Sequence, residues 1–211
     1  MIERVRLSAS RFNDAVKRAK IVPEFAAVAA DPLEAVRAAL PLTPDLLAWY
    51  ETGAPRNLHI PWNGSTLLLY DPLDLPDAQS GYRWEAWEAG APRNPFAYWD
   101  PNWLVIGDIG ADPIIAHTEQ PDTPISMALH GAGNWTPQPV APSLATLLDL
   151  LTIWLERIII PHDIGKGGRL FWEAILTSDL EMRPEIVQEL KAAWSDVVDE
   201  SCVKNFLDFV C

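Results

Sequence analysis

A histidine and several carboxylates lie close together near the middle of the sequence, and they are the first candidates for chemistry. His117 and Glu119 are two residues apart, so in an extended strand both side chains point to the same side of a sheet. A metal site needs three or four such ligands in a defined geometry, and no second histidine stands at a paired spacing. Asp108 and Asp112 are better explained as turn residues whose carboxylates bond to the backbone. We therefore expect no metal ion and no other cofactor.

Two other patterns of catalytic chemistry are incomplete. The segment from Gly165 to Arg169 carries a lysine among glycines, but a phosphate-binding loop has Ser or Thr after the lysine, where this chain has Gly167. No Gly-x-Ser-x-Gly turn is present, and neither Cys202 nor Cys211 stands beside a base. The sequence therefore predicts a protein that is not an enzyme. A small-molecule-binding domain or an enzyme with a pocket on the sheet near His117 stays the alternative.

Strands in the middle of the chain and helices at both ends would position these residues. Residues 103–108 and 113–118 are apolar runs joined by Gly and Asp, which is typical of a β-hairpin. Residues 66–70 and 124–130 predict further strands. Helix starts are expected at Ser10, Thr43, Ser143 and Pro184. The expected fold class is α+β, with a mainly antiparallel, twisted β-sheet flanked by N- and C-terminal α-helices.

The segment from residue 73 to residue 101 is rich in Pro, Gly, Asp and Trp and has no regular pattern. We interpret it as a long, ordered excursion over the sheet. Such a loop is either functional or an insertion without function, and the sequence leaves both interpretations open.

Charge is distributed unevenly along the 211 residues, whose formal net charge is −13. Residues 1–20 hold six basic and two acidic groups, whereas residues 71–122 hold two basic and ten acidic groups. An acidic zone repels a phosphate backbone and attracts a basic partner, so nucleic-acid binding is disfavoured. The acidity is equally explained as a means of keeping the protein in solution.

The composition favours a folded protein of the cytoplasm. Hydrophobic residues make up 49% of the chain, which is enough for a core. The first residues lack the apolar segment of a signal peptide, and the most apolar stretch, residues 144–160, is interrupted by charges and does not suit a membrane span. The two cysteines are expected to be free thiols in a reducing compartment.

Three segments in a fixed order resemble a known superfamily. They are the helix Leu40-Pro-Leu-Thr-Pro-Asp-Leu-Leu-Ala-Trp-Tyr50, the hairpin from Trp103 to Thr118 with its Gly-Asp-Ile-Gly-Ala-Asp-Pro centre, and the closure Val140-Ala-Pro-Ser-Leu-Ala-Thr-Leu-Leu148. This order is similar to that of the SUKH superfamily, which includes a fungal cell-wall synthesis regulator and many bacterial immunity proteins. The resemblance implies a SUKH-like α+β core over residues 38–160. Residues 1–37 would then be an N-terminal helical extension, and residues 161–211 a C-terminal helical extension packed on the core.

The resemblance also implies a non-catalytic protein-binding role. Many bacterial members bind a toxin domain, often a nuclease, and block its active site. An acidic surface with aromatic anchors suits a basic partner of this kind. From local sequence alone we place the contact in residues 71–122, and the identity of the partner and the oligomeric state stay open. The residues expected nearest to the partner are Trp84, Trp87, Asp100, Asp108, Asp112 and Glu119.

Overall fold

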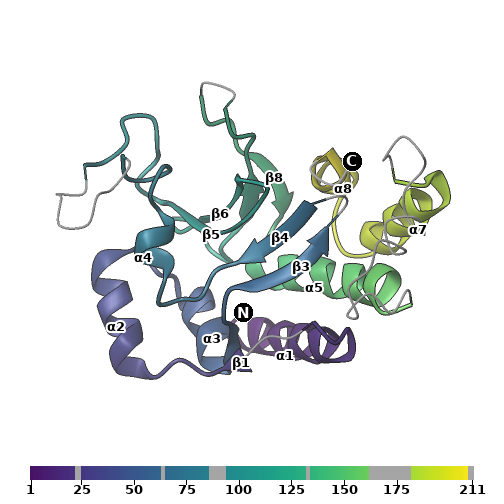
Figure 1. The fold of residues 1–211 in the computed structure, drawn as a ribbon, viewed down its shortest axis with the longest axis horizontal. Helices are drawn as coiled ribbons and strands as arrows, with labels where there is room; N and C mark the ends of the chain where they lie inside the picture. Colours follow the sequence, from purple (N-terminus) through teal and green to yellow (C-terminus); the bar gives the residue numbers. More distant parts are fainter. Residues whose placement is uncertain (22–24, 63–64, 86–93, 132–133, 162–181, 209–211) are drawn as a thin grey trace.

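A six-stranded antiparallel sheet forms the middle of the fold (Figure 1). The structure, a computed structural model, describes residues 1–21, 25–62, 65–85, 94–131, 134–161 and 182–208. Each strand of the sheet pairs with the next along the chain, and helices precede and follow it, so the expected α+β class is confirmed. The strands are β3 (Leu58–Trp62), β4 (Ser65–Leu69), β5 (Trp103–Ile109), β6 (Asp112–His117), β7 (Ile125–Met127) and β8 (Gln138–Ala141), with a separate pair of β1 (Phe25–Ala26) and β2 (Ala54–Pro55).

The expected hairpin is confirmed as β5 and β6, and glycines make it possible. Gly110 adopts a positive φ of 60° in the turn, a conformation that costs glycine little. Gly107 lies beside an irregularity in the β5–β6 register, where a side-chain Cβ would stand 2.2 Å from the carbonyl oxygen of Leu68. Only a residue without a Cβ allows β4 and β5 to approach this closely.

Helix starts follow the sequence signals except at the N-terminus. The side chains of Thr43 and Ser143 accept hydrogen bonds from backbone amides three residues later, which confirms both as N-caps. The predicted start at Ser10 is wrong, because the buried face of the first helix already begins at Val5 and Ser10 lies exposed within it. The helices are α1 (Ile2–Arg18), α2 (Ala30–Ala39), α3 (Pro44–Gly53), α4 (Leu75–Ala78), α5 (Leu144–Trp154) with the π-helical turn η1 (Leu155–Ile159), α7 (Pro184–Ser195) and α8 (Glu200–Asp208).

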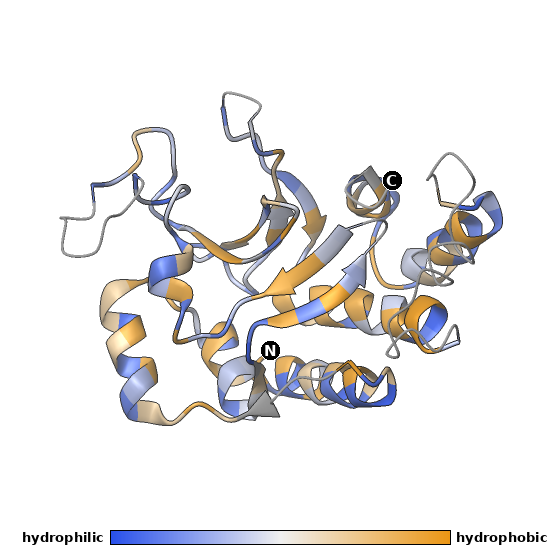
Figure 2. Ribbon diagram, viewed as in Figure 1, coloured by the Kyte–Doolittle hydropathy of each residue, from blue (hydrophilic) through white to orange (hydrophobic). Residues whose placement is uncertain are grey.

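The two faces of the sheet bury different side chains, because successive residues of a strand point to opposite faces. Leu104 and Ile106 of β5 belong to the main core, whereas Val105 between them belongs to a second cluster. The main core lies between the sheet and the helical layer of α1, α3 and α5 (Figure 1). Figure 2 shows hydrophobic residues along α5 and at the end of β4, whereas on β3 they are interspersed with hydrophilic ones. The helices therefore cover one face of the sheet and leave the other to loops.

The C-terminal helices complete the main core. The ring of Trp62 on β3 lies 4.3 Å from that of Trp154 on α5 and 5.4 Å from that of Phe206 on α8, while Trp194 on α7 lies 5.0 Å from Phe206. The buried cluster runs from Val5 to Leu207. Within the described residues, the expected extensions at 1–37 and 161–211 thus share one core with the middle of the chain.

Each edge strand of the sheet contains a proline whose carbonyl accepts a hydrogen bond from a side chain. The indole N–H of Trp154 donates to the carbonyl of Pro61 on β3, at 3.0 Å. The side-chain amide of Asn205 on α8 donates to the carbonyl of Pro139 on β8, at 2.8 Å. Proline offers no N–H of its own, so neither edge is suited to pairing with a strand of another chain.

Candidate partner-binding surface

The face of the sheet that the helices leave free carries a cluster of aromatic rings, here called the aromatic face. Trp99 is its centre, with ring centroids 5.8 Å from Tyr82, 5.4 Å from Trp103 and 5.3 Å from Trp135. Several of these pairs are edge-to-face or tilted, the arrangements that aromatic quadrupoles favour. The aromatic face comprises Tyr82, Trp99, Val105, Ile115 and Ala128, with Tyr70, Phe96, Trp103 and Trp135 partly buried against them.

The excursion between β4 and β5 is fastened to the sheet by specific hydrogen bonds. Gln79, which is fully buried, accepts from the backbone N–H of Val105 at 3.0 Å and donates to the Val105 carbonyl at 2.9 Å. Its amide therefore replaces a neighbouring strand at this position of β5. The hydroxyl of Tyr82 donates to the carbonyl of Ala111, and the indole of Trp99 donates to the carbonyl of Trp103. These bonds fix the rings of the aromatic face in place.

Exposed apolar side chains neighbour the aromatic face in the sequence. Tyr98, next to Trp99, is 70% exposed, and Leu129, next to Ala128, is 58% exposed. Trp103 and Trp135 are only partly buried. Partly buried aromatic side chains beside exposed ones are typical of the anchors of protein interfaces. Sequence analysis missed these residues, although the alternation along residues 103–106 could have separated Trp103 from the main core.

Two of the predicted site residues meet at one end of the aromatic face. Asp108 accepts from the hydroxyl of Tyr70 at 2.6 Å and from the amide of Ala111 at 3.1 Å, and Asp112 accepts from the amide of His130 at 2.6 Å. Burial, together with these two carboxylates, raises the pKa of Tyr82 to about 12. Burial and the bond to Asp108 likewise raise the pKa of Tyr70. Both phenols therefore stay neutral and present no negative charge.

Two other predicted residues lie at the opposite end. Glu119 follows β6 and is exposed, and Asp100 precedes β5, where it accepts from the amide of Asn102 at 2.8 Å. Asp112 and His117 are five residues apart on one strand, which separates the two ends by about 17 Å. The structure thus places these four carboxylates around the aromatic face and does not bring them into one compact group.

The predicted tryptophans stand apart from this arrangement. Trp84 packs against the main core, with the guanidinium of Arg83 5.1 Å from the centre of its ring. Burial lowers the pKa of Arg83 and nearby Asp100 raises it, and the group stays a cation. Trp87 lies outside the described residues.

His117 lies between a serine and a carboxylate, an order that resembles a hydrolytic triad. Its Nε2 is 2.9 Å from the hydroxyl of Ser126, and its Nδ1 is 3.8 Å from the nearer oxygen of Glu119, which is beyond hydrogen-bond length. Ser126 is only 5% exposed, and the ring of Trp103 covers the edge of the imidazole at 6.1 Å. A nucleophile must reach its substrate, so this arrangement is better suited to a structural cross-strand contact. Among the described residues, no three His, Cys, Asp or Glu side chains form a group that could hold a metal ion.

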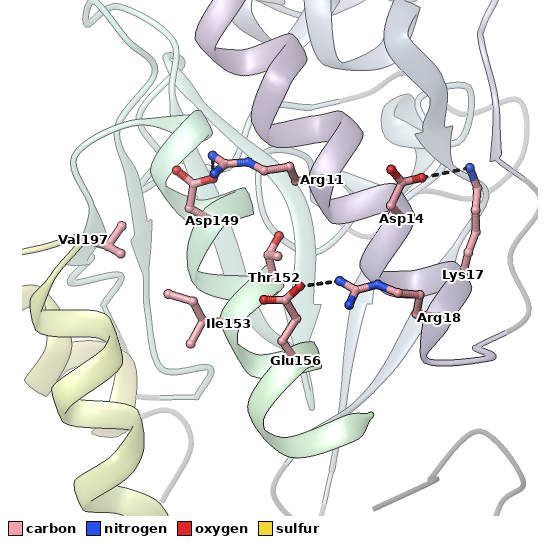
Figure 3. A pocket seen from close by; sticks show the side chains of 9 residues that line it. All are labelled: Arg11, Asp14, Lys17, Arg18, Asp149, Thr152, Ile153, Glu156 and Val197. Carbon is pink, nitrogen blue, oxygen red and sulfur yellow. Dashed lines mark hydrogen bonds and ion pairs between the residues drawn. The ribbon is translucent and has the colours of Figure 1, made fainter. Parts of the chain in front are cut away.

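Basic residues of the N-terminal helix form ion pairs with acidic residues of the helical layer. Figure 3 shows Arg11 of α1 paired with Asp149 of α5 at 2.7 Å, Arg18 paired with Glu156, and Lys17 paired with Asp14 at 3.4 Å. The hollow between α1 and α5 is lined by these six charges, each with a partner of opposite sign. It therefore offers no free charge to a ligand.

Negative charge accumulates in the segment that runs from β4 to β7. Between residues 65 and 131 the described chain has nine acidic residues, and among these described positions Arg83 is the one Lys or Arg. Asp71 is neutralised by Arg56 at 2.7 Å, but that pair leaves eight acidic residues against one arginine. The strands and loops that build the aromatic face are thus strongly acidic, while the helical layer is nearly balanced.

Comparisons with protein-family models, with curated proteins and with solved structures found no match to this chain. None of the described helices combines the length and apolar character needed to cross a membrane.

Proposed function

We propose that this chain is a non-catalytic protein-binding domain that neutralises a basic toxin domain, such as a nuclease, in the cytoplasm. The observation that carries the proposal is the coincidence of a partly open aromatic face with the acidic side of the molecule. Exposed Tyr98 and Leu129 and partly buried Trp103 supply apolar contact area. The surrounding carboxylates supply attraction for a cationic surface. The resemblance to the SUKH superfamily supports the same role.

The partner docks on the face of the sheet and not along its edges. Strand addition needs a free row of N–H and C=O groups, and the carbonyls of Pro61 and Pro139 are already occupied by Trp154 and Asn205. A folded basic domain suits a face of this kind better than an extended peptide does. Nucleic acid does not, because its phosphates are repelled by the acidic residues.

The alternative of a ligand pocket or an active site near His117 has less support. Trp103 and the buried Ser126 fill the space around the imidazole, whereas a small-molecule site is expected to be concave and open to its ligand. A protein partner needs no such cavity, because it contacts the packed aromatic side chains from outside.

Charge reversal at the rim tests the proposal. The tagged protein is used to capture its partner from the native host at low salt, and the captured protein is then purified for kinetic measurements. Glu119→Lys, on the exposed rim, is expected to slow association at least about tenfold, and high salt is expected to weaken the wild-type complex. Asp196→Lys makes the same charge change at an exposed position directly after α7 and is the control. Equal slowing by both variants, or binding that does not depend on salt, would overturn the proposal.

A further inference from the structure

Two adjoining hollows lie where three helices begin. They are formed by the starts of α1, α3 and α5 together with the loop of residues 118–123 that follows β6. Asp45, in the first turn of α3, and Asp122, in the loop, line both hollows, as does Met1. The site lies apart from the aromatic face and does not depend on the proposed function.

Both carboxylates lack the partners that buried carboxylates normally have. Asp45 is 6% exposed, yet it makes no hydrogen bond and no ion pair with any described residue. Oδ1 of Asp122 is also buried without a donor among the described residues. A buried charge is costly unless it is paired, and such an unsatisfied group in a folded protein calls for an explanation.

Hydrogen bonds hold the backbone of the loop beside the starts of two helices. Asp122 and Thr123 both adopt positive φ angles, 66° and 51°. The hydroxyl of Thr123 lies 2.7 Å from that of Thr43, the N-cap of α3, and the amide of Leu144 donates to the carbonyl of Asp122. The loop is thus fastened to the starts of α3 and α5, which holds the backbone of Asp122 beside the start of α3.

The nearby positive charges do not provide the two carboxylates with a partner. The terminal amino group lowers the pKa of Asp45, but burial and the charge of Asp122 outweigh it and raise that pKa. Arg4 bonds to the hydroxyl of Thr146, and Arg6 pairs with Glu3 and Glu51. The start of a helix favours a carboxylate, so Asp45 could also serve only to stabilise α3 through the helix dipole. A measurement of stability distinguishes this role from ligand binding.

We infer that the hollow between Asp45 and Asp122 binds the guanidinium group of an arginine side chain. A guanidinium donates five N–H groups in a planar fork, which suits two carboxylates that lack donors. The walls also present apolar side chains to the alkyl part of arginine, namely Met1, Ile2, Leu42, Pro44 and Pro121. A bare metal ion is less suited, because a third His, Cys, Asp or Glu ligand is absent from the described residues around the pair.

Titration with a small arginine derivative tests this inference. N-acetyl-arginine methylamide is added to the full chain while the backbone amide resonances of Leu46 and Thr123 are followed by NMR. We expect saturable shifts at these amides and none with the citrulline analogue, which has the same shape and no charge. Asp45→Asn and Asp122→Asn are each expected to weaken binding at least about tenfold, as the loss of a charged hydrogen bond does. Asp196→Asn, a remote and exposed change, is expected to leave binding unchanged.

Stability separates the binding role from the dipole role. If the Asp45 carboxylate only stabilises the start of α3, the Asp45→Asn variant is less stable than the wild type. If the carboxylate is an unpaired buried charge of a binding site, the variant is equally stable or more stable. Equal shifts with citrulline, or unaltered binding in both Asn variants together with lower stability of Asp45→Asn, would overturn the inference. These results are obtained without the protein partner, so failure here and failure of the proposed function are distinguishable.

Discussion

Single polar side chains decide how the loops of this protein meet its sheet. Gln79 is the clearest case, because one buried amide satisfies both backbone groups of Val105 and also donates to the carbonyl of Leu75. An amide at this position is needed because the pairing of β4 with β5 ends before Val105, which leaves that side of β5 without a strand. Its loss leaves two buried backbone groups without partners.

Replacing Gln79 with alanine is therefore expected to lower the free energy of unfolding by about 2–4 kcal/mol. Chemical denaturation followed by tryptophan fluorescence measures the change. Gln138→Ala removes an exposed glutamine and serves as the control, with an expected change of about 0.5 kcal/mol or less. Equal stability of the two variants would show that the amide of Gln79 does not hold the excursion on the sheet.

Asp45 makes the stability of the protein depend on pH in an unusual direction. Its pKa is raised in the folded state, so the folded state holds the proton more tightly and the ionised group destabilises the fold at neutral pH. This destabilisation disappears as the pH falls through the raised pKa towards 3.8, the ordinary pKa of an aspartate. The groups that line the same hollows are Asp122, Glu3, Arg4, Arg6 and the terminal amino group.

The difference in unfolding free energy between Asp45→Asn and the wild type is therefore expected to favour the variant at pH 7 and to shrink on acidification. Denaturation curves at neutral pH and at about pH 4 give this difference directly. A difference that grows at the lower pH would mean that Asp45 is stabilised by a partner in the folded protein.

At the scale of elements, the C-terminal helices close the structure. The position of Phe206 between Trp62 and Trp194 connects α8 to β3 at one edge of the sheet and to α7. Asn205 connects the same helix to β8 at the other edge. These contacts make α8 part of the main core and not an independent docking module.

Phe206→Ala is accordingly expected to cost about 3–5 kcal/mol and to lower the stability of the whole chain in a single transition. Calorimetry checks the magnitude and the number of transitions. Leu129→Ala, which removes an exposed apolar side chain, is expected to change the stability little. A separate early transition in the Phe206 variant would indicate that the C-terminal helices fold apart from the sheet.

The elements that local signals mark could be predicted, and those that depend on distant contacts could not. The hairpin of β5 and β6 follows from its glycines and alternation, and α3 and α5 from their caps. Strand β3 contains Pro61 and exposed His59, which hide its pattern, and α1 contains serines that resemble a helix start. The roles of Gln79 and Asp45 were invisible, because each depends on a segment more than 20 residues away.

At the scale of the whole molecule, the aromatic face is built by an acidic segment of the chain, residues 65–131, whereas the helical layer of α1, α3 and α5 is nearly balanced in charge. The acidic composition of residues 71–122 was evident from the sequence, and the position of Asp108 and Asp112 at one end of the aromatic face became clear only in the structure. In the helical layer, ion pairs such as Arg11–Asp149 neutralise basic residues of α1. Under the proposed function, we expect the carboxylates around the aromatic face to attract a basic partner.

The most direct test of this account is a side-by-side capture of the partner by three forms of the tagged protein. The forms are the wild type, the face variant Tyr98→Ala with Leu129→Ala, and the control Leu7→Ala, which removes an exposed apolar side chain from α1 in the helical layer. Mass spectrometry quantifies each captured protein. We expect a basic protein at near-stoichiometric yield with the wild type and the control, and its loss with the face variant. Equal recovery by the face variant and the wild type would contradict the assignment of the aromatic face as the binding surface.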